Sequence, residues 1–228
     1  MKLISLLLVI NTAKYVGQAE FDLKIIIIMK KNIQPDKTKK IIVTGFGGQG
    51  VILAGRILGQ AASLGDIMES TLVESYGPES RGGACSAQVV ISEKTVHYPY
   101  IDSPDILICL SQAGYEKFCG NIARNGKLLI DHDLVHDVKG EKDIFYSIPA
   151  TRKAENLGQK MMANIIMIGF ATAITGIISI DAACKAITDL VPKGTEEHNV
   201  DAFHKGYDYG LTTLKGLEKR TSSKGVIS

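Results

Sequence analysis

The sequence contains no tryptophan, and aromatic residues make up only 6% of its 228 positions. Proteins that bind single-stranded nucleic acid usually stack the bases on aromatic side chains along a basic groove. Here the formal net charge is only +2, from 26 Lys and Arg against 24 Asp and Glu. The composition therefore argues against a dedicated nucleic-acid-binding protein.

Closely spaced cysteines are also absent. The four cysteines are Cys85, Cys109, Cys119 and Cys184, and no two of them form a C-x-x-C pair. An iron–sulfur ferredoxin or a zinc ribbon needs such pairs. We therefore expect free thiols, buried or incidental, and a protein of the reducing cytoplasm.

The sequence has no recognisable catalytic set. It contains no H-E-x-x-H, no phosphate-binding P-loop, no Ser/His/Asp or Cys/His arrangement and no thiamine diphosphate motif of the Gly-Asp-Gly…Asn kind. His97 lies near two tyrosines but has no partner base or nucleophile. His132 lies between Asp131 and Asp133, and neighbouring residues on a strand point to opposite faces. We expect neither a catalytic residue nor a metal site.

The first 28 residues hold two short apolar runs, residues 3–10 and 25–28. Neither reaches the ~20 residues that a membrane-spanning helix needs. The first has the form of a signal peptide, but Met29 followed by two lysines resembles a second start. An over-long reading frame is the favoured interpretation, with a signal or anchor and a genuine extension as alternatives. We expect residues 1–38 to lie outside the fold and no segment to enter a membrane.

A glycine loop follows the first predicted strand. The apolar residues 41–44 lead into Gly45, Gly47, Gly48, Gln49 and Gly50, and an apolar, helix-compatible run covers residues 51–64. Glycine lets another group approach the backbone closely, and a helix start suits an anion. The spacing fits a dinucleotide fingerprint, with Glu69 lying 19 residues beyond Gly50 to bind a ribose hydroxyl. The glycines could equally form a tight turn against another subunit.

A second unusual segment follows the next predicted strand, residues 66–73. It comprises Glu74, Ser75, Tyr76, Gly77, Pro78, Glu79, Ser80, Arg81, Gly82 and Gly83. Its proline and glycines predict a loop. Arg81, its only strong cation, suits a carboxylate or phosphate, or an internal pair with Glu74 or Glu79. Both segments follow strands of one βαβ unit, so we expect them at the same end of the sheet.

The remaining pattern predicts an α/β fold with a mostly parallel sheet of βαβ units. Residues 84–91 and 95–100 read as a β-hairpin insert, and residues 105–110, 127–131 and 144–149 as further strands. Ser111 and Ser179 are predicted helix N-caps. The apolar residues 161–178 include Asn164, which predicts a buried or subunit-facing helix rather than a membrane span. We expect one domain over residues 39–217, with a helical C-terminal part, and a flexible tail over residues 218–228.

The two glycine-bearing segments together resemble the gamma subunit of 2-oxoacid:ferredoxin oxidoreductases. The residues Ser75-Tyr76-Gly77-Pro78-Glu79 and Arg81-Gly82-Gly83 most resemble the 2-oxoglutarate branch. The resemblance covers roughly residues 39–214 and leaves residues 1–28 without a counterpart. It implies a subunit that supports oxidative decarboxylation of a 2-oxo acid to its acyl-CoA, with reduction of ferredoxin.

The same resemblance implies that the cofactors lie elsewhere. Thiamine diphosphate, magnesium and iron–sulfur clusters would belong to partner subunits that bind thiamine, the oxo acid and electrons, and coenzyme A would be a co-substrate. The two segments would form one surface that docks on those subunits and helps to hold coenzyme A, with Arg81 as the phosphate or carboxylate contact. The alternative is a stand-alone NAD(P)-binding Rossmann-type module.

Overall fold

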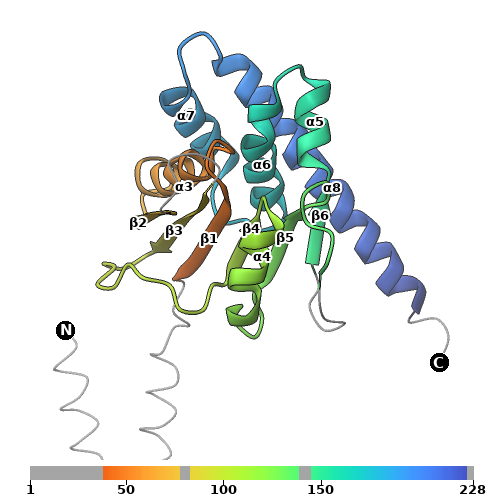
Figure 1. Ribbon diagram of the computed structural model, residues 1–228, viewed down its shortest axis with the longest axis horizontal. Coiled ribbons are helices and arrows are strands. Elements are labelled where there is room, and N and C mark those ends of the chain that lie inside the picture. Colours follow the sequence, from red (N-terminus) through yellow and green to blue (C-terminus); the bar gives the residue numbers. More distant parts are fainter. Residues whose placement is uncertain (1–37, 78–82, 139–144, 225–228) are drawn as a thin grey trace, which may run out of the picture. The chain divides into compact units, whose positions relative to one another are not determined.

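The computed structural model describes residues 38–77, 83–138 and 145–224 (Figure 1). The chain divides into two units, Met1–Lys37 and Thr38–Ser228, and the described residues all belong to the second. Pro78, Glu79, Arg81 and Gly82 lie outside the described residues, as does Ser80.

A six-stranded sheet forms the centre of this unit, in the order β2-β3-β1-β4-β5-β6. The strands are β1 (Lys39–Phe46), β2 (Glu69–Tyr76), β3 (Ala84–Ser92), β4 (Ile106–Cys109), β5 (Lys127–Asp131) and β6 (Phe145–Ile148). Strands β1, β4, β5 and β6 pair in parallel, whereas β3 is antiparallel to both of its neighbours, β1 and β2. The predicted α/β class is confirmed, and β1 and β2 run in the same direction on either side of β3.

The predicted β-hairpin, in which residues 84–91 pair with residues 95–100, is wrong. Residues 95–100 form no strand, and β3 pairs with β2 instead. The segment after β3 folds over the sheet, where Val96 packs against the core and the Ile101 amide donates to Gln88 Oε1 at 2.9 Å. Its alternating pattern therefore reflects packing of a loop on the sheet and not strand pairing.

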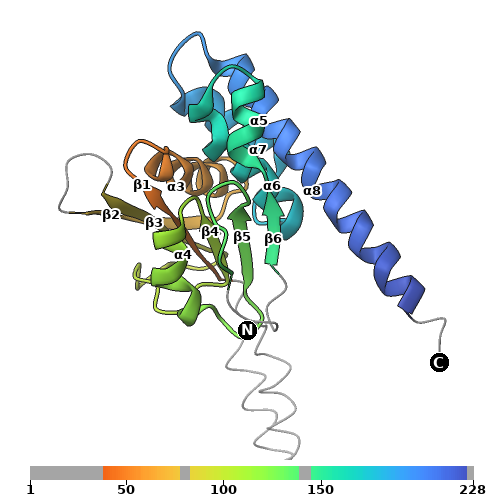
Figure 2. The same ribbon diagram turned by 45° about the vertical axis from the view of Figure 1, so that its right-hand side comes forward.

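Helices cover the two faces of the sheet unequally (Figure 2). One face carries α3 (Val51–Gln60), which continues as a π-helical turn (Ala61–Gly65), with α5 (Ala150–Asn156), α6 (Ala163–Thr175), α7 (Ile180–Leu190) and α8 (Glu196–Lys224). The other face carries α4 (Gln112–Phe118), whose Tyr115 packs against Ile42 and Leu107. Short 3₁₀ turns, Cys119–Asn121 and Lys160–Met162, follow α4 and precede α6.

Both predicted serine caps are confirmed. The hydroxyl of Ser111 accepts from the Gly114 amide at 3.1 Å, and that of Ser179 accepts from the Ala182 amide at 3.2 Å. The C-terminal helix, expected to end near residue 217, continues to Lys224. Of the described helices, none is both long and apolar enough to span a membrane.

Helix α6 is the buried helix that residues 161–178 predicted, and it crosses α8 at unusually short range. A Cβ added to Gly169 would lie 2.0 Å from the Phe203 carbonyl oxygen, and one added to Gly206 would lie 1.9 Å from that of Ile166. The two backbones can approach this closely only because glycine has no side chain.

Candidate functional site

The two glycine-bearing segments meet at the carboxyl ends of β1 and β2. The Gly47 amide donates a 2.9 Å hydrogen bond to the Gly83 carbonyl oxygen. In the register of the sheet, Phe46 lies opposite Ala84, and Tyr76 lies opposite Cys85. The described parts of both segments therefore flank the start of β3, as their order in a βαβ unit predicted.

The side chain of Gln49 fixes the shape of the glycine loop. Its Oε1 accepts from the Phe46 amide at 2.6 Å, and its Nε2 donates to the Leu110 carbonyl oxygen at 2.8 Å. The Gln49 amide also donates to the Phe46 carbonyl oxygen at 3.1 Å, closing a turn. Gln49 thus ties the end of β1 to the residue that follows β4.

The last residue of the loop is held by α6. Gly50 has φ +71° and is the N-cap of α3, without a side-chain cap. The Asn164 side chain donates from Nδ2 to the Gly50 carbonyl oxygen at 3.0 Å, and its Oδ1 accepts from the Ile165 amide at 2.9 Å. Asn164 is only 1% exposed, so the partner that its polarity required is the glycine loop itself.

A cavity of about 350 Å³ opens beside this loop. The residues that line it follow β1, β4 and β5 or lie near the starts of α5 and α6: Gly48, Gln49, Leu110, Leu134, Thr151, Met161 and Ala163. From β1 the chain passes to β2 on one side of β1 in the sheet, whereas β4 lies on the other side of β1. The cavity therefore lies at the switch point of the sheet, which is where open α/β sheets bind ligands.

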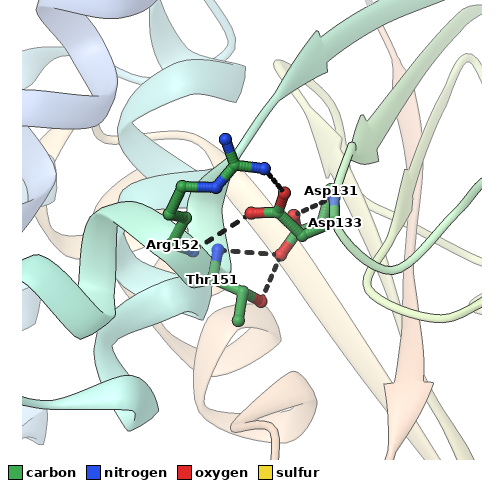
Figure 3. A network of polar contacts seen from close by, with 4 residues as sticks. All are labelled: Asp131, Asp133, Thr151 and Arg152. Atoms are coloured by element: carbon green, nitrogen blue, oxygen red, sulfur yellow. Dashed lines mark hydrogen bonds and ion pairs between the residues drawn. The ribbon is translucent and has the colours of Figure 1, made fainter.

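A polar network supports the far wall of the cavity (Figure 3). Asp131 is buried, and its Oδ2 accepts from the Thr151 amide at 3.0 Å and from the Thr151 hydroxyl at 2.6 Å. Asp133 pairs with the Arg152 guanidinium and accepts from the Arg152 amide at 3.2 Å. The two aspartates therefore hold the start of α5 against the end of β5.

Two aromatic side chains remain exposed at this end of the sheet, Phe46 at 39% and Tyr76 at 66%. The Tyr76 hydroxyl donates to Glu74 Oε2 at 2.5 Å, and Arg56 of α3 pairs with Glu74 at 2.9 Å. The hydrogen bond from the Tyr76 hydroxyl, and to a smaller extent Arg56, lowers the pKa of Glu74 below its usual value. The Tyr76 side chain is thus held in place although its ring faces solvent.

Within residues 38–77, 83–138 and 145–224, no group of three or more His, Cys, Asp or Glu side chains is placed to hold a metal ion. All four cysteines are free, as expected, and burial raises the pKa of the Cys85, Cys109 and Cys184 thiols. Asp131 is hydrogen-bonded to Thr151, and Asp133 is paired with Arg152.

Glu69 does not lie where a ribose-binding acid would have to be. It is the first residue of β2 and is exposed, so the length of the strand separates it from the glycine loop. An eight-residue strand spans about 23 Å between its end residues. Strand β3 also lies between β1 and β2, and the dinucleotide-binding interpretation is therefore not supported.

Comparison with known proteins gives one consistent family. The family model described as "Pyruvate ferredoxin/flavodoxin oxidoreductase" matches residues 40–209. The chain is 50% identical over 173 residues to "2-oxoglutarate synthase subunit KorC" of Methanocaldococcus jannaschii, covering 75% of this chain and 92% of that one.

Two solved structures have a similar fold. The gamma subunit of a keto/oxoacid ferredoxin oxidoreductase from Geobacter sulfurreducens PCA superposes with a TM-score of 0.68 at 35% identity, over 76% of this chain and 99% of that one. A 2-oxoglutarate:ferredoxin oxidoreductase from Magnetococcus marinus, with 2-oxoglutarate, coenzyme A and succinyl-CoA bound, gives 0.69 at 22% identity, over 77% of this chain and 31% of that one. The second likeness, at this identity, concerns the fold alone.

Proposed function

The chain belongs to the pyruvate ferredoxin/flavodoxin oxidoreductase family and is a subunit of a multi-subunit oxoacid:ferredoxin oxidoreductase, and we propose that the enzyme it serves acts on 2-oxoglutarate. The support is the identity of 50% to a 2-oxoglutarate synthase subunit over 92% of that protein. The enzyme would convert 2-oxoglutarate and coenzyme A to succinyl-CoA and carbon dioxide, with two electrons passed to ferredoxin. Thiamine diphosphate, magnesium and the iron–sulfur clusters would lie on partner subunits, in the cytoplasm.

We propose that the part of this chain turned toward those subunits is the strand-end surface, defined as the Gly45–Gly50 loop, Ser75 to Gly77, and Gly83. The observation that carries the proposal is the Gly47–Gly83 hydrogen bond, because it joins the two segments into one surface. Gln49 and Asn164 hold the loop from behind. Phe46 and Tyr76 add exposed aromatic area, which is enriched in protein interfaces.

Coenzyme A is the ligand that this surface would help to hold. The start of α3 has no side-chain cap, and its amides and helix dipole favour a phosphate. The adjacent cavity of about 350 Å³ lies at the same strand ends. Arg81 enters the proposal from the sequence alone, as a cation in the Ser75–Gly83 segment that suits phosphate.

Co-expression with the partner subunits tests the docking surface. Phe46→Asp places a charge on the strand-end surface, and the matched control Tyr98→Asp alters an aromatic residue that is 63% exposed in the connection after β3. We expect Phe46→Asp to lower the amount of purified complex at least tenfold and Tyr98→Asp to leave it unchanged. Equal yields of complex from both variants would contradict the proposal.

The coenzyme A role has its own test. In the assembled enzyme, Arg81→Ala is expected to raise the KM for coenzyme A, or for the oxo acid if Arg81 contacts a carboxylate, at least fivefold. Unchanged KM values for both substrates would remove Arg81 from the site. Fluorescence titration of the isolated chain with NADH should show no saturable binding, because Glu69 lies at the far end of β2 from the glycine loop.

A further inference from the structure

Strand β2 is an edge strand with few features that would block pairing with another strand. It forms eight consecutive pairs with β3, from Glu69 opposite Ser92 to Tyr76 opposite Cys85, without a bulge. It lies at the rim of the sheet (Figure 1), and no strand within the described part of the chain pairs with its outer edge. Half of the backbone N–H and C=O groups of an edge strand point outward.

The sequence of β2 contains few of the devices that block edge pairing, and its only charged side chains are Glu69 and Glu74. Glu-Ser-Thr-Leu-Val-Glu-Ser-Tyr has no proline and no lysine, and its middle is Leu72-Val73. None of its eight residues is fully buried. The side-chain oxygen of Thr71 is buried without a hydrogen-bond partner in the described residues, which is uncommon in native proteins.

The two faces of β2 are distinct, which limits how another strand can join it. Ser70, Leu72 and Glu74 point toward α3, where Ser70 Oγ donates to the Gly59 carbonyl oxygen at 2.9 Å and Arg56 pairs with Glu74. Thr71 and Val73 point to the opposite face, because side chains alternate along a strand. Residues that lie opposite each other across an antiparallel pair share one face.

We propose that β2 pairs antiparallel with β2 of a second copy of this chain, so that two six-stranded sheets join into one sheet. A two-fold axis that keeps both α3 helices on the same face must pass through a residue, and we place it at Leu72. Ser70 then lies opposite Glu74 of the second copy, Thr71 opposite Val73, Glu69 opposite Ser75, and Leu72 opposite itself.

This register is better than the two neighbouring registers, with the axis at Val73 or at Thr71. It sets no two carboxylates against each other and matches apolar Leu72 with itself. An axis at Val73 would place Leu72 against Glu74, and an axis at Thr71 would place Glu69 against Val73. Apolar and hydroxyl pairs stabilise cross-strand contacts, whereas an apolar residue facing a carboxylate contributes little.

The flanking helices leave room for the second copy. Helix α3 packs above β3, where a Cβ on Gly55 would meet the Ala87 side chain. Two copies of β3 would be three strand spacings apart, or about 14 Å, whereas packed helices need about 8–10 Å. Pairing of one strand buries little area, so we expect a weak dimer in isolation, with a Kd of about 10–500 μM.

Charge variants at Val73 test the proposal, which does not depend on the proposed function. Val73 lies opposite Thr71 and diagonal to Val73 of the second copy, so Val73→Lys and Val73→Glu each place like charges beside the axis. Sedimentation equilibrium of the full chain should show a dimer whose Kd rises at least tenfold in either variant. Val73→Thr, the neutral control, should dimerise as the unaltered chain does.

Mixing the two charged variants is the decisive arm. Opposite charges would then meet at the axis, and a Lys–Glu heterodimer should form with a Kd within about threefold of the unaltered chain. A monomer up to about 1 mM, a dimer insensitive to Val73→Lys, or a mixture that stays monomeric would each overturn the proposal. If the chain alone is monomeric but Val73→Lys prevents assembly of the multi-subunit enzyme, the edge of β2 contacts a different subunit. That result would also overturn the proposal.

Discussion

The Asn164 side chain donates a 3.0 Å hydrogen bond to the Gly50 carbonyl oxygen, joining two residues that lie 114 positions apart. This contact connects the strand-end surface to α6, most of whose residues are buried. A loop that is tied from behind keeps its shape when it is exposed, and less ordering is then needed when a partner binds.

Replacing Asn164 tests how much this contact stabilises the fold. Asn164→Ala removes the hydrogen bonds that the side chain makes with the Gly50 carbonyl oxygen and the Ile165 amide. Because Gly50 O keeps its bond from the Ala54 amide, we expect the free energy of unfolding to fall by about 1–2 kcal/mol. Exposed Asn156→Ala is the control and should change it by less than about 0.5 kcal/mol. Urea denaturation measures both, and equal values would contradict the account.

The glycines at positions 48 and 50 form a matched pair. Both have positive φ, +96° and +71°, but a Cβ on Gly48 meets nothing within 4 Å, whereas one on Gly50 would lie 2.2 Å from Asn164 Nδ2. Gly48→Ala should cost about 1 kcal/mol from backbone strain alone, and Gly50→Ala about 3 kcal/mol.

The double variant Gly50→Ala with Asn164→Ala isolates the clash. Removing the asparagine side chain should relieve the overlap, so the double variant should lose less stability than the two single variants added together. Additive losses in chemical denaturation would show that Gly50 and Asn164 are not in direct contact.

Two glycines of α8 are expected to change stability in opposite directions when replaced by alanine, because one lies at the crossing with α6 and the other does not. Gly206→Ala would force a Cβ to 1.9 Å from the Ile166 carbonyl oxygen and should destabilise the fold by about 3 kcal/mol or more. Gly216→Ala lies on the same helix with nothing within 4 Å, and should stabilise it by about 0.5–1 kcal/mol. Thermal melts that shift in the same direction for both would refute this packing.

The ion pair behind Tyr76 predicts a pH effect. Because the pKa of Glu74 is lowered in the folded state, its contribution to stability is present above the unfolded pKa of about 4.3 and is lost as pH falls through the folded value. Tyr76→Phe removes the largest cause, so the Glu74 pKa should rise toward its usual value in a ¹³C NMR titration. Tyr98→Phe is the control and should leave the Glu74 titration curve unchanged. An unchanged curve in Tyr76→Phe would contradict the hydrogen bond.

Local patterns were sufficient for much of the fold. The apolar residues of β1, the glycine loop and the caps at Ser111 and Ser179 depend on neighbours within a few positions, and the structure contains them all. The Asn164–Gly50 contact was not predictable in that way. The sequence showed that a buried asparagine needs a partner, but the partner depends on how α6 lies against a loop 114 positions away.

The second strand begins later in the sequence than predicted, because of contacts with distant parts of the chain. Ile67 and Met68 read as strand residues, yet β2 begins at Glu69, because α3 ends in a π-helical turn and the Asp66 carboxylate accepts from the Ser179 amide at 2.8 Å. Ile67 consequently adopts φ +55° and is 91% exposed. A β-branched residue in that conformation is disfavoured, and single-sequence patterns do not predict it.

Cryo-electron microscopy of the complete enzyme, purified with all its subunits, tests the central claim most directly. The account predicts that Phe46, Gly48 and Tyr76 contact a partner subunit and that the cavity beside Gly48 opens toward its active site. A map in which the strand-end surface faces solvent while every subunit is present would contradict the account.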